Sequence, residues 1–218
     1  YQIEDGKIEQ ITDYGVLTSP KFPVWSKTGS IFYSTEESFS DGQLRRIDPL
    51  TREKEVIYSG SAEYFAFPRL SHDGAWIAYH EANRTYLLPA DGGEPVEMKP
   101  VDGKQVWGPV WDGATNRLLY HQGEVPVLPV IVHDFEKEMN WEVVSMRMSS
   151  WGEWASWSPS GDRVAFLARS PNRRSVTKLI VADTENATLS QADADFEGRG
   201  PKANSPAWIS NNTLLYIV

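Results

Sequence analysis

The side chains best suited to bind a ligand stand just ahead of five copies of one repeated phrase, whose anchor residues are Trp25, Leu70, Trp111, Trp157 and Trp208. The position four residues before each anchor is filled by Lys21, Ala66, Trp107, Glu153 and Asn204. A uniform core does not need such variety, whereas polar groups beside rigid aromatic side chains are typical of a binding mouth. Together with two nearby aromatic residues, this predicts a site for a ligand or partner at Lys21, Tyr64, Trp107, Trp151, Glu153 and Asn204.

A second cluster suggests metal chemistry only weakly. Asp193, Asp195 and Glu197 alternate ahead of Gly198 and imitate the start of a calcium loop, because hard cations bind several carboxylate oxygens. The twelfth position is Asn204 and not the bidentate glutamate of such loops. The favoured interpretation is therefore a solvated acidic loop, with calcium as the weaker alternative and no other cofactor expected.

Signatures of hydrolytic chemistry are weak. The sequence contains no Gly-x-Ser-x-Gly nucleophile elbow. A propeller that cleaves glycans needs carboxylates facing one sugar, and Glu63, Asp112 and Glu153 are not expected to converge. The sequence therefore predicts that the chain is not an enzyme.

The elements that must position these residues follow from the repeat. The anchors recur every 41 to 51 residues, close to the ~40–45 residues of a four-stranded propeller blade. In the clearest copy a strand holds Trp157 and a turn holds Gly161, where glycine tolerates the positive φ of tight hairpins. A second strand then ends on Phe166, and a third on Asp183.

The fifth copy stops after its second strand, and its missing half stands at the other end of the chain. Tyr1–Asp5 matches a third strand and Lys7–Thr12 a fourth, which would close the ring without an unpaired edge. The prediction is an all-β, five-bladed β-propeller with four antiparallel strands per blade. An open sandwich with coincidental repeats is the alternative.

The predicted single domain, 1–218, divides by repeat. The N-terminal segment 1–15 forms the outer strands of the closing blade, and segment 201–218 its inner strands. The four complete blades cover 16–60, 61–102, 103–148 and 149–200.

The amino-acid composition narrows the classes of partner that we expect this chain to bind. The net charge is −9, and Arg45-Arg46 and Arg173-Arg174 are the densest basic clusters, so nucleic acid is not an expected partner. The chain has no cysteine, and no apolar stretch approaches the ~20 residues that span a bilayer, so no membrane insertion is expected. We expect a monomer.

The repeat also resembles a known family. Trp157-Ser158-Pro159-Ser160-Gly161-Asp162-Arg163-Val164-Ala165-Phe166 is similar to the PD40, or WD40-like, repeat of TolB-like propellers, and the resemblance extends along essentially the whole chain. It implies an extracytoplasmic protein, periplasmic or secreted, with a partner-binding role.

The function expected from the residues and the resemblance is a non-catalytic binding or scaffold module for a protein or peptide partner at the channel mouth. The alternatives are a carbohydrate-binding or carbohydrate-active propeller, such as a glycosidase or lyase, and the propeller domain of a larger peptidase.

Overall fold

The computed structural model describes the chain as β-strands and turns. The described residues are 9–13, 19–38, 41–60, 66–81, 84–99, 104–123, 127–147, 155–169, 176–197 and 206–215. Every regular element in these ranges is a strand, which confirms the all-β prediction, and none of them contains a helix able to cross a membrane. The chain divides into two compact units, Tyr1–Leu70 with Gly74–Val96, and Ser71–Asp73 with Glu97–Val218. Each unit is described by itself.

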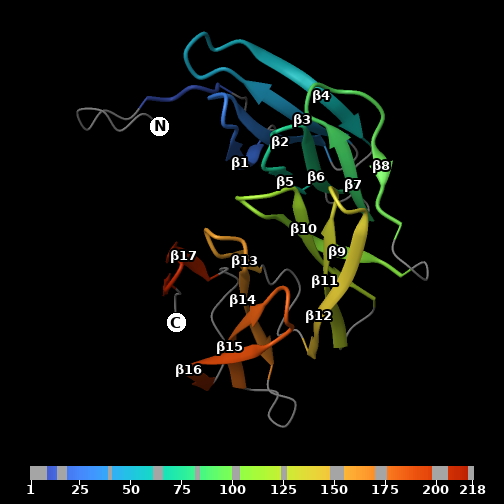
Figure 1. The fold of residues 1–218 in the computed structure, drawn as a ribbon. Helices are drawn as coiled ribbons and strands as arrows, with labels where there is room; N and C mark the ends of the chain where they lie inside the picture. Colours follow the sequence, from blue (N-terminus) through green and yellow to red (C-terminus); the bar gives the residue numbers. More distant parts are fainter. Residues whose placement is uncertain are drawn as a thin grey trace. The chain divides into compact units, whose positions relative to one another are not determined.

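The first unit holds two sheets of four strands each, both in sequence order (Figure 1). The first sheet consists of β1 (Ser19–Trp25), β2 (Ile31–Ser38), β3 (Asp41–Ile47) and β4 (Lys54–Gly60). The second consists of β5 (Ala66–Leu70), β6 (Trp76–Glu81), β7 (Arg84–Pro89) and β8 (Val96–Glu97). In each sheet the first strand is an edge strand, as the repeat predicts.

The core of the first unit forms because strand side chains alternate between the two faces of a sheet. Phe32 of β2 packs with Ile77 and Tyr79 of β6 in one buried cluster. The neighbouring residues Ile31 and Tyr33 point to the other face, where Ile11 packs against them. Both faces of β2 are therefore covered, which explains its continuous apolar run.

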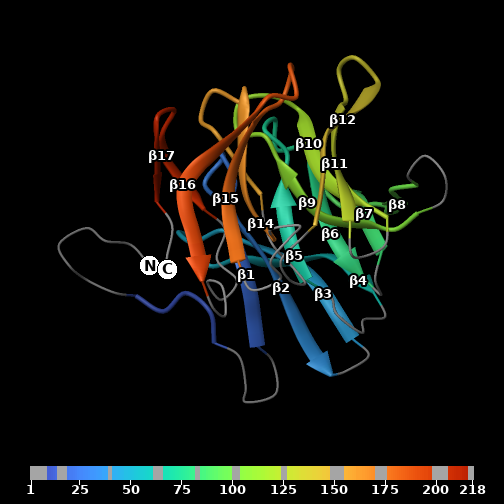
Figure 2. The ribbon, with the colours of Figure 1, turned by 90° about the horizontal axis from the view of Figure 1, so that it is seen from below.

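The second unit holds two sheets of four strands and one of two (Figure 2). The third sheet consists of β9 (Val106–Trp111), β10 (Arg117–Gln122), β11 (Val127–Asp134) and β12 (Met139–Arg147). The fourth consists of β13 (Ser156–Trp157), β14 (Arg163–Arg169), β15 (Val176–Asp183) and β16 (Leu189–Glu197). The two-stranded sheet pairs β17 (Ala207–Ser210) with β18 (Thr213–Leu215).

Tryptophan anchors tie neighbouring sheets of the second unit together. Trp157 Nε1 donates to Val110 O at 2.9 Å, and Trp208 Nε1 donates to Ser156 O at 2.9 Å. Val110 and Ser156 each directly precede the anchor of their own sheet. Each of these two indoles therefore binds the same point of the sheet before it.

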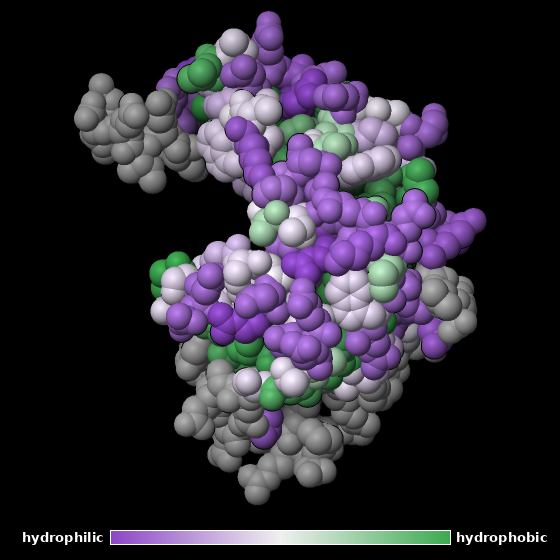
Figure 3. Space-filling view, in the orientation of Figure 1, coloured by the Kyte–Doolittle hydropathy of each residue, from purple (hydrophilic) through white to green (hydrophobic). Residues whose placement is uncertain are grey.

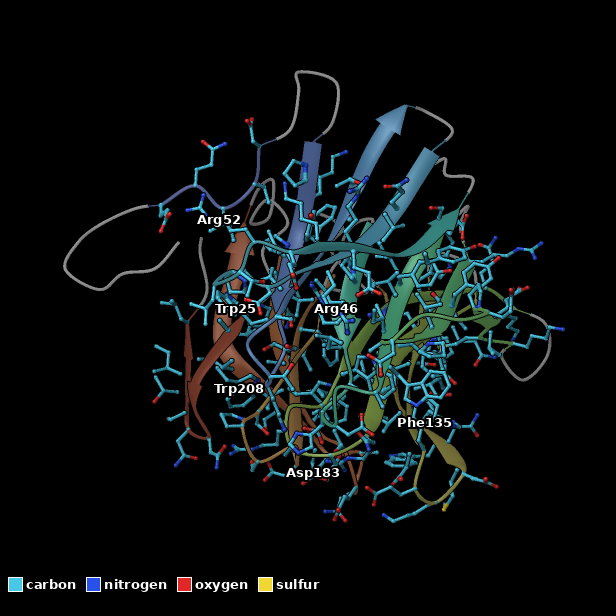
Figure 4. The ribbon with its side chains drawn as sticks, turned by 90° about the horizontal axis from the view of Figure 1, so that it is seen from above. Trp25, Arg46, Arg52, Phe135, Asp183 and Trp208 are labelled. Atoms are coloured by element: carbon cyan, nitrogen blue, oxygen red, sulfur yellow. The ribbon has the colours of Figure 1, made fainter. Side chains whose placement is uncertain are left out.

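Arginines at the start of the second strands complete this link. The Arg117 guanidinium lies 5.1 Å from the centre of the Trp157 ring, and that of Arg163 lies 5.3 Å from the Trp208 ring. Arg117 Nη2 also donates to Gly161 O at 2.5 Å. By contrast, Trp25 is 58% exposed (Figure 4), and within the described part of the first unit no sheet precedes β1.

The sheets support the predicted repeat, whereas ring closure stays a prediction. Four sheets have four antiparallel strands and one has two, and none closes on itself. Residues 9–13, the described part of the proposed closing strands, form no strand. Instead Ile11 packs on the first sheet and Glu9 pairs with Arg52.

Candidate functional site

Three first strands share a β-bulge at the same point of the repeat. Two residues of the first strand lie opposite a single tyrosine of the second strand in each case. The bulged pairs are Phe22-Pro23, Phe67-Pro68 and Gly108-Pro109, opposite Tyr33, Tyr79 and Tyr120. Proline has no N–H to give to a ladder, so it is accommodated at a bulge on an edge strand. The Phe-Pro and Gly-Pro steps of the phrase are therefore the sequence origin of the bulges.

Two of these bulges require an unusual backbone. Gly108 has φ of 57° and Phe22 has φ of 54°, the left-handed region that glycine adopts freely and bulky residues rarely adopt. Strained backbone of this kind is concentrated at ligand-binding and active sites. The phenylalanine at such a position marks the bulge of β1 as a candidate site.

The position just before the three bulges, four residues ahead of the anchor, holds a different residue in every copy of the repeat. Lys21 pairs with Ser34, and Trp107 pairs with His121; the equivalent in β5 is Ala66. Lys21 and Trp107 are both half-buried. A bulge bends its strand and re-aims the neighbouring side chains, and Lys21 and Trp107 are the last paired residues before the ladder is interrupted.

The structure describes only two of the six residues of the predicted site. Lys21 belongs to the first unit and Trp107 to the second, so each is placed only within its own unit. The other predicted residues, Tyr64, Trp151, Glu153 and Asn204, lie outside the described residues. The site as a whole therefore stays a prediction, with two of its members located on equivalent strand positions.

The acidic segment near the end of the chain is a strand and not the loop that was expected. Backbone pairing continues through β16, where Lys178 is opposite Asp195 and Val176 opposite Glu197. Asp193 belongs to the same strand. An extended strand does not supply the turn of a calcium loop. Among the residues that the structure describes, no group of three or more acidic or histidine side chains is placed to hold a metal ion.

Sequence reasoning missed a buried carboxylate in the first unit. Glu81 is only 7% exposed, and the Tyr58 hydroxyl donates to its Oε2 at 3.3 Å. A Cβ on Gly60 would lie 2.2 Å from Glu81 Oε1, so a larger residue there would require the Glu81 carboxylate to shift. Burial raises the pKa of Tyr58. The available signal was a polar residue directly after a histidine in two successive copies, His80-Glu81 and His121-Gln122.

His80 and Asp112 have structural roles. The His80 ring Nδ1 lies 2.9 Å from Arg84 O and 3.0 Å from Thr85 Oγ1, and burial lowers its pKa. The buried Asp112 carboxylate accepts from Thr115 Oγ1 at 2.6 Å and pairs with Arg117 at 2.8 Å. These partners occupy Asp112 in its own turn.

Comparison with known proteins gives a likeness of fold. No family model matches the chain, and no curated protein sequence matches it. An oligogalacturonate lyase in complex with manganese superposes with a TM-score of 0.65 at 14% identity, covering 84% of this chain and 55% of the lyase. TolB from Acinetobacter baumannii gives 0.61 at 16% identity, covering 86% and 45%. A puromycin-hydrolyzing peptidase from Mycobacterium tuberculosis gives 0.63 at 15% identity, covering 92% and 32%.

The prediction that the chain is not an enzyme is wrong, because enzymes share this fold. A lyase and a peptidase share the fold at TM-scores of 0.65 and 0.63, so an enzymatic role is compatible with it. The physical reason is that a fold sets the strands, whereas chemistry depends on the groups carried by loops and added domains.

The chain spans about half the length of the lyase and of TolB. The likeness extends over most of this chain, and it agrees with the antiparallel four-stranded sheets and the repeated anchors. The resemblance to TolB-like propeller repeats is thereby confirmed as one of fold.

Proposed function

We propose that the chain is a TolB-like propeller module that binds a protein or peptide partner at the end of the sheets where the first strands begin. The binding residues would be Lys21, Tyr64, Trp107, Trp151, Glu153 and Asn204. The observation that carries the proposal is the repeated bulge. It places dissimilar side chains, Lys21, Ala66 and Trp107, at one equivalent position beside an interrupted ladder.

The distribution of hydrophobic residues on the surface supports a site in which a few residues anchor the partner. On the face drawn in Figure 3, hydrophobic residues form separate patches among hydrophilic ones. A partner held by such a surface would depend on individual aromatic anchors, and tryptophan is enriched among residues whose loss costs 2 kcal/mol or more. Trp107 is the described aromatic residue at the proposed position.

We infer an extracytoplasmic location and a monomeric state from the same resemblance and from the predicted closed ring of five blades. Fractionation of the source cells and light scattering on the purified chain test these two expectations. Recovery in the cytosolic fraction, or a dimeric mass, would contradict the corresponding one.

A photo-crosslinking amino acid at position 107 tests the binding face. The matched control carries the same group at position 76, because Trp76 is 37% exposed and begins β6, at the opposite end of the sheet from the Ala66–His80 pair. With an envelope extract we expect a protein adduct at position 107 and none at position 76. The unlabelled chain should compete with adduct formation, and its Trp107→Ala variant should not.

The identified partner then allows affinity to be measured directly. Trp107→Ala should weaken binding by roughly thirtyfold, equivalent to about 2 kcal/mol, and Trp76→Ala should leave it unchanged. Crosslinking only at position 76, or equal losses in both variants, would place the partner on another face. Saturable binding of a glycan in place of a protein would favour the carbohydrate alternative.

A further inference from the structure

A cavity of about 240 Å³ lies against the third sheet, within the second unit. Its lining includes Pro129 and Ile131 of β11 and Glu142 of β12. Ile131 and Glu142 are cross-strand partners. The alternate residues Val130 and Val132 are fully buried in the core on the other face of the sheet. Pro129, Ile131 and Glu142 therefore line the cavity from the face that this core does not use, whereas the lining residue Trp141 pairs with Val132 and is on the core side.

The polar lining combines two carboxamides with two opposite charges. Gln122 is 8% exposed, whereas Asn140, near the start of β12, is exposed to solvent. Lys104 and Glu142 are the charged lining residues, and both are exposed to solvent. A ligand in this cavity thus meets one cation, one anion and two groups that both donate and accept hydrogen bonds.

The aromatic lining residue has its polar group directed elsewhere. Trp141 Nε1 donates to Thr184 O at 2.6 Å, and the ring packs against the apolar core. The Trp141 ring is therefore not positioned as a stacking platform for a sugar. Pro129 and Ile131 supply the apolar surface instead.

We propose that this cavity binds a small zwitterion, an amino acid or a short peptide with free ends. Its ammonium group would donate to Glu142, its carboxylate would accept from Lys104, and an aliphatic side chain would lie against Ile131. Charge-assisted bonds of this kind are about twice as strong as neutral ones. The volume is below the ~300–1,000 Å³ of pockets for drug-sized ligands, so the ligand is small. The proposal does not depend on the partner site at Lys21 and Trp107.

Calorimetric titration of the full chain with L-leucine and with the dipeptide leucyl-leucine tests the proposal. N-acetyl-leucine amide has the same side chain and neither charge, and glucose is a neutral hydroxylated control. We expect saturable binding of at least one zwitterion and of neither control. Glu142→Gln and Lys104→Gln should each weaken binding by about tenfold or more, as expected for loss of a charged hydrogen-bond partner.

Two charge-matched variants outside the cavity, Glu136→Gln and Lys137→Gln, should bind as the unchanged chain does; both residues stand in the turn between β11 and β12. Circular dichroism checks that each variant is folded, and the comparison of leucine with its uncharged amide needs no variant. Absence of saturable zwitterion binding, equal binding of N-acetyl-leucine amide, or equal losses in the control variants would overturn the proposal.

Discussion

Asp112 carries a buried charge that needs compensating partners in the fold. Its side chain is fully buried and that of Arg117 is only 11% exposed. The carboxylate also accepts from the Ala114 N–H at 2.9 Å. A buried charge needs such partners because desolvation otherwise disfavours folding. Asp112 stands where three other copies of the repeat have serine, so this charge pair is particular to the third sheet.

Removing Asp112 should therefore destabilise the fold strongly. Asp112→Ala leaves the Arg117 guanidinium buried without its counter-ion, at an expected cost of about 3 kcal/mol or more in the free energy of unfolding. Glu55→Gln is the control, because Glu55, which is exposed, pairs with Arg46 (labelled in Figure 4), and its loss should cost less than about 1 kcal/mol. Urea denaturation followed by fluorescence measures both. Equal losses would contradict the assigned roles.

Two aspartates at the ends of third strands should contribute to the acid dependence of stability. Asp183 Oδ1 accepts from the Asn186 N–H at 2.7 Å and the Glu185 N–H at 2.9 Å. The Asn186 hydrogen bond is the largest cause of its lowered pKa. Asp134 makes the same turn with Glu136 and Lys137. Although burial opposes the shift at Asp134, these hydrogen bonds and the nearby Lys137 charge lower its pKa as well.

The sign of the pH effect follows from these lowered pKa values. The unfolded chain binds protons at a higher pH than the folded chain does, so the stabilisation is present above the unfolded aspartate pKa of about 3.9 and is lost as the pH falls through the folded value. Asp183→Asn should flatten the acid limb of unfolding midpoint against pH below about pH 4. An unchanged limb in this variant would contradict the assignment.

At the scale of elements, the repeated anchor residues stabilise the fold through their contacts between neighbouring sheets. Trp157 is 8% exposed, donates to Val110 O, and is covered by Arg117. The third and fourth sheets also share an apolar core that includes Phe166. The anchor thus combines apolar burial with one directed hydrogen bond between strands that are far apart in sequence.

One substitution tests how much the Trp157 hydrogen bond and its large ring together contribute to stability. Trp157→Phe should lower the free energy of unfolding by about 1–3 kcal/mol, because it leaves a small cavity and a carbonyl without its donor. Trp25→Phe is the matched control, with an expected loss below about 0.5 kcal/mol for a residue that is 58% exposed. Chemical denaturation monitored by circular dichroism compares them. A larger loss at Trp25 than at Trp157 would reverse this account.

At the scale of the whole molecule, the N-terminal segment carries the prediction of ring closure. Glu9 pairs with Arg52, and Ile11 packs on the first sheet beside Ile31 and Tyr33. A deletion of residues 1–8 keeps both contacts and removes the proposed third strand of the last blade together with the first two residues of the proposed fourth strand. It therefore separates closure from the local packing of Ile11.

We expect deletion of residues 1–8 to lower the unfolding midpoint and to increase binding of a hydrophobic dye, because a closed ring would gain an unpaired strand edge. Ile11→Ala in the full chain measures the local contact alone. An unchanged midpoint after the deletion would contradict closure by Tyr1–Asp5.

Local chemistry made most of the sheets predictable. The Pro23 and Pro109 positions, the glycine turn at Gly161 and the alternation around Phe32 all act within a few residues, so the sequence predicted the strands they produce. The strand at 189–197 was missed because its acidic side chains suggested solvent, whereas pairing with β15 determines its backbone. Glu81 was missed because its burial depends on Tyr58 of a different sheet.

The sequence by itself determined the all-β class, the repeated anchors and the position of the variable residue ahead of each anchor, because these depend on period and turn chemistry. Only the tertiary structure decided that Pro23 and Pro109 produce bulges, that Trp157 and Trp208 donate to the preceding sheet, and that Asp112 is buried with Arg117. The tryptophan hydrogen bonds join residues distant in sequence, and the energies of all these features depend on distance and burial, which no pattern along a single chain encodes.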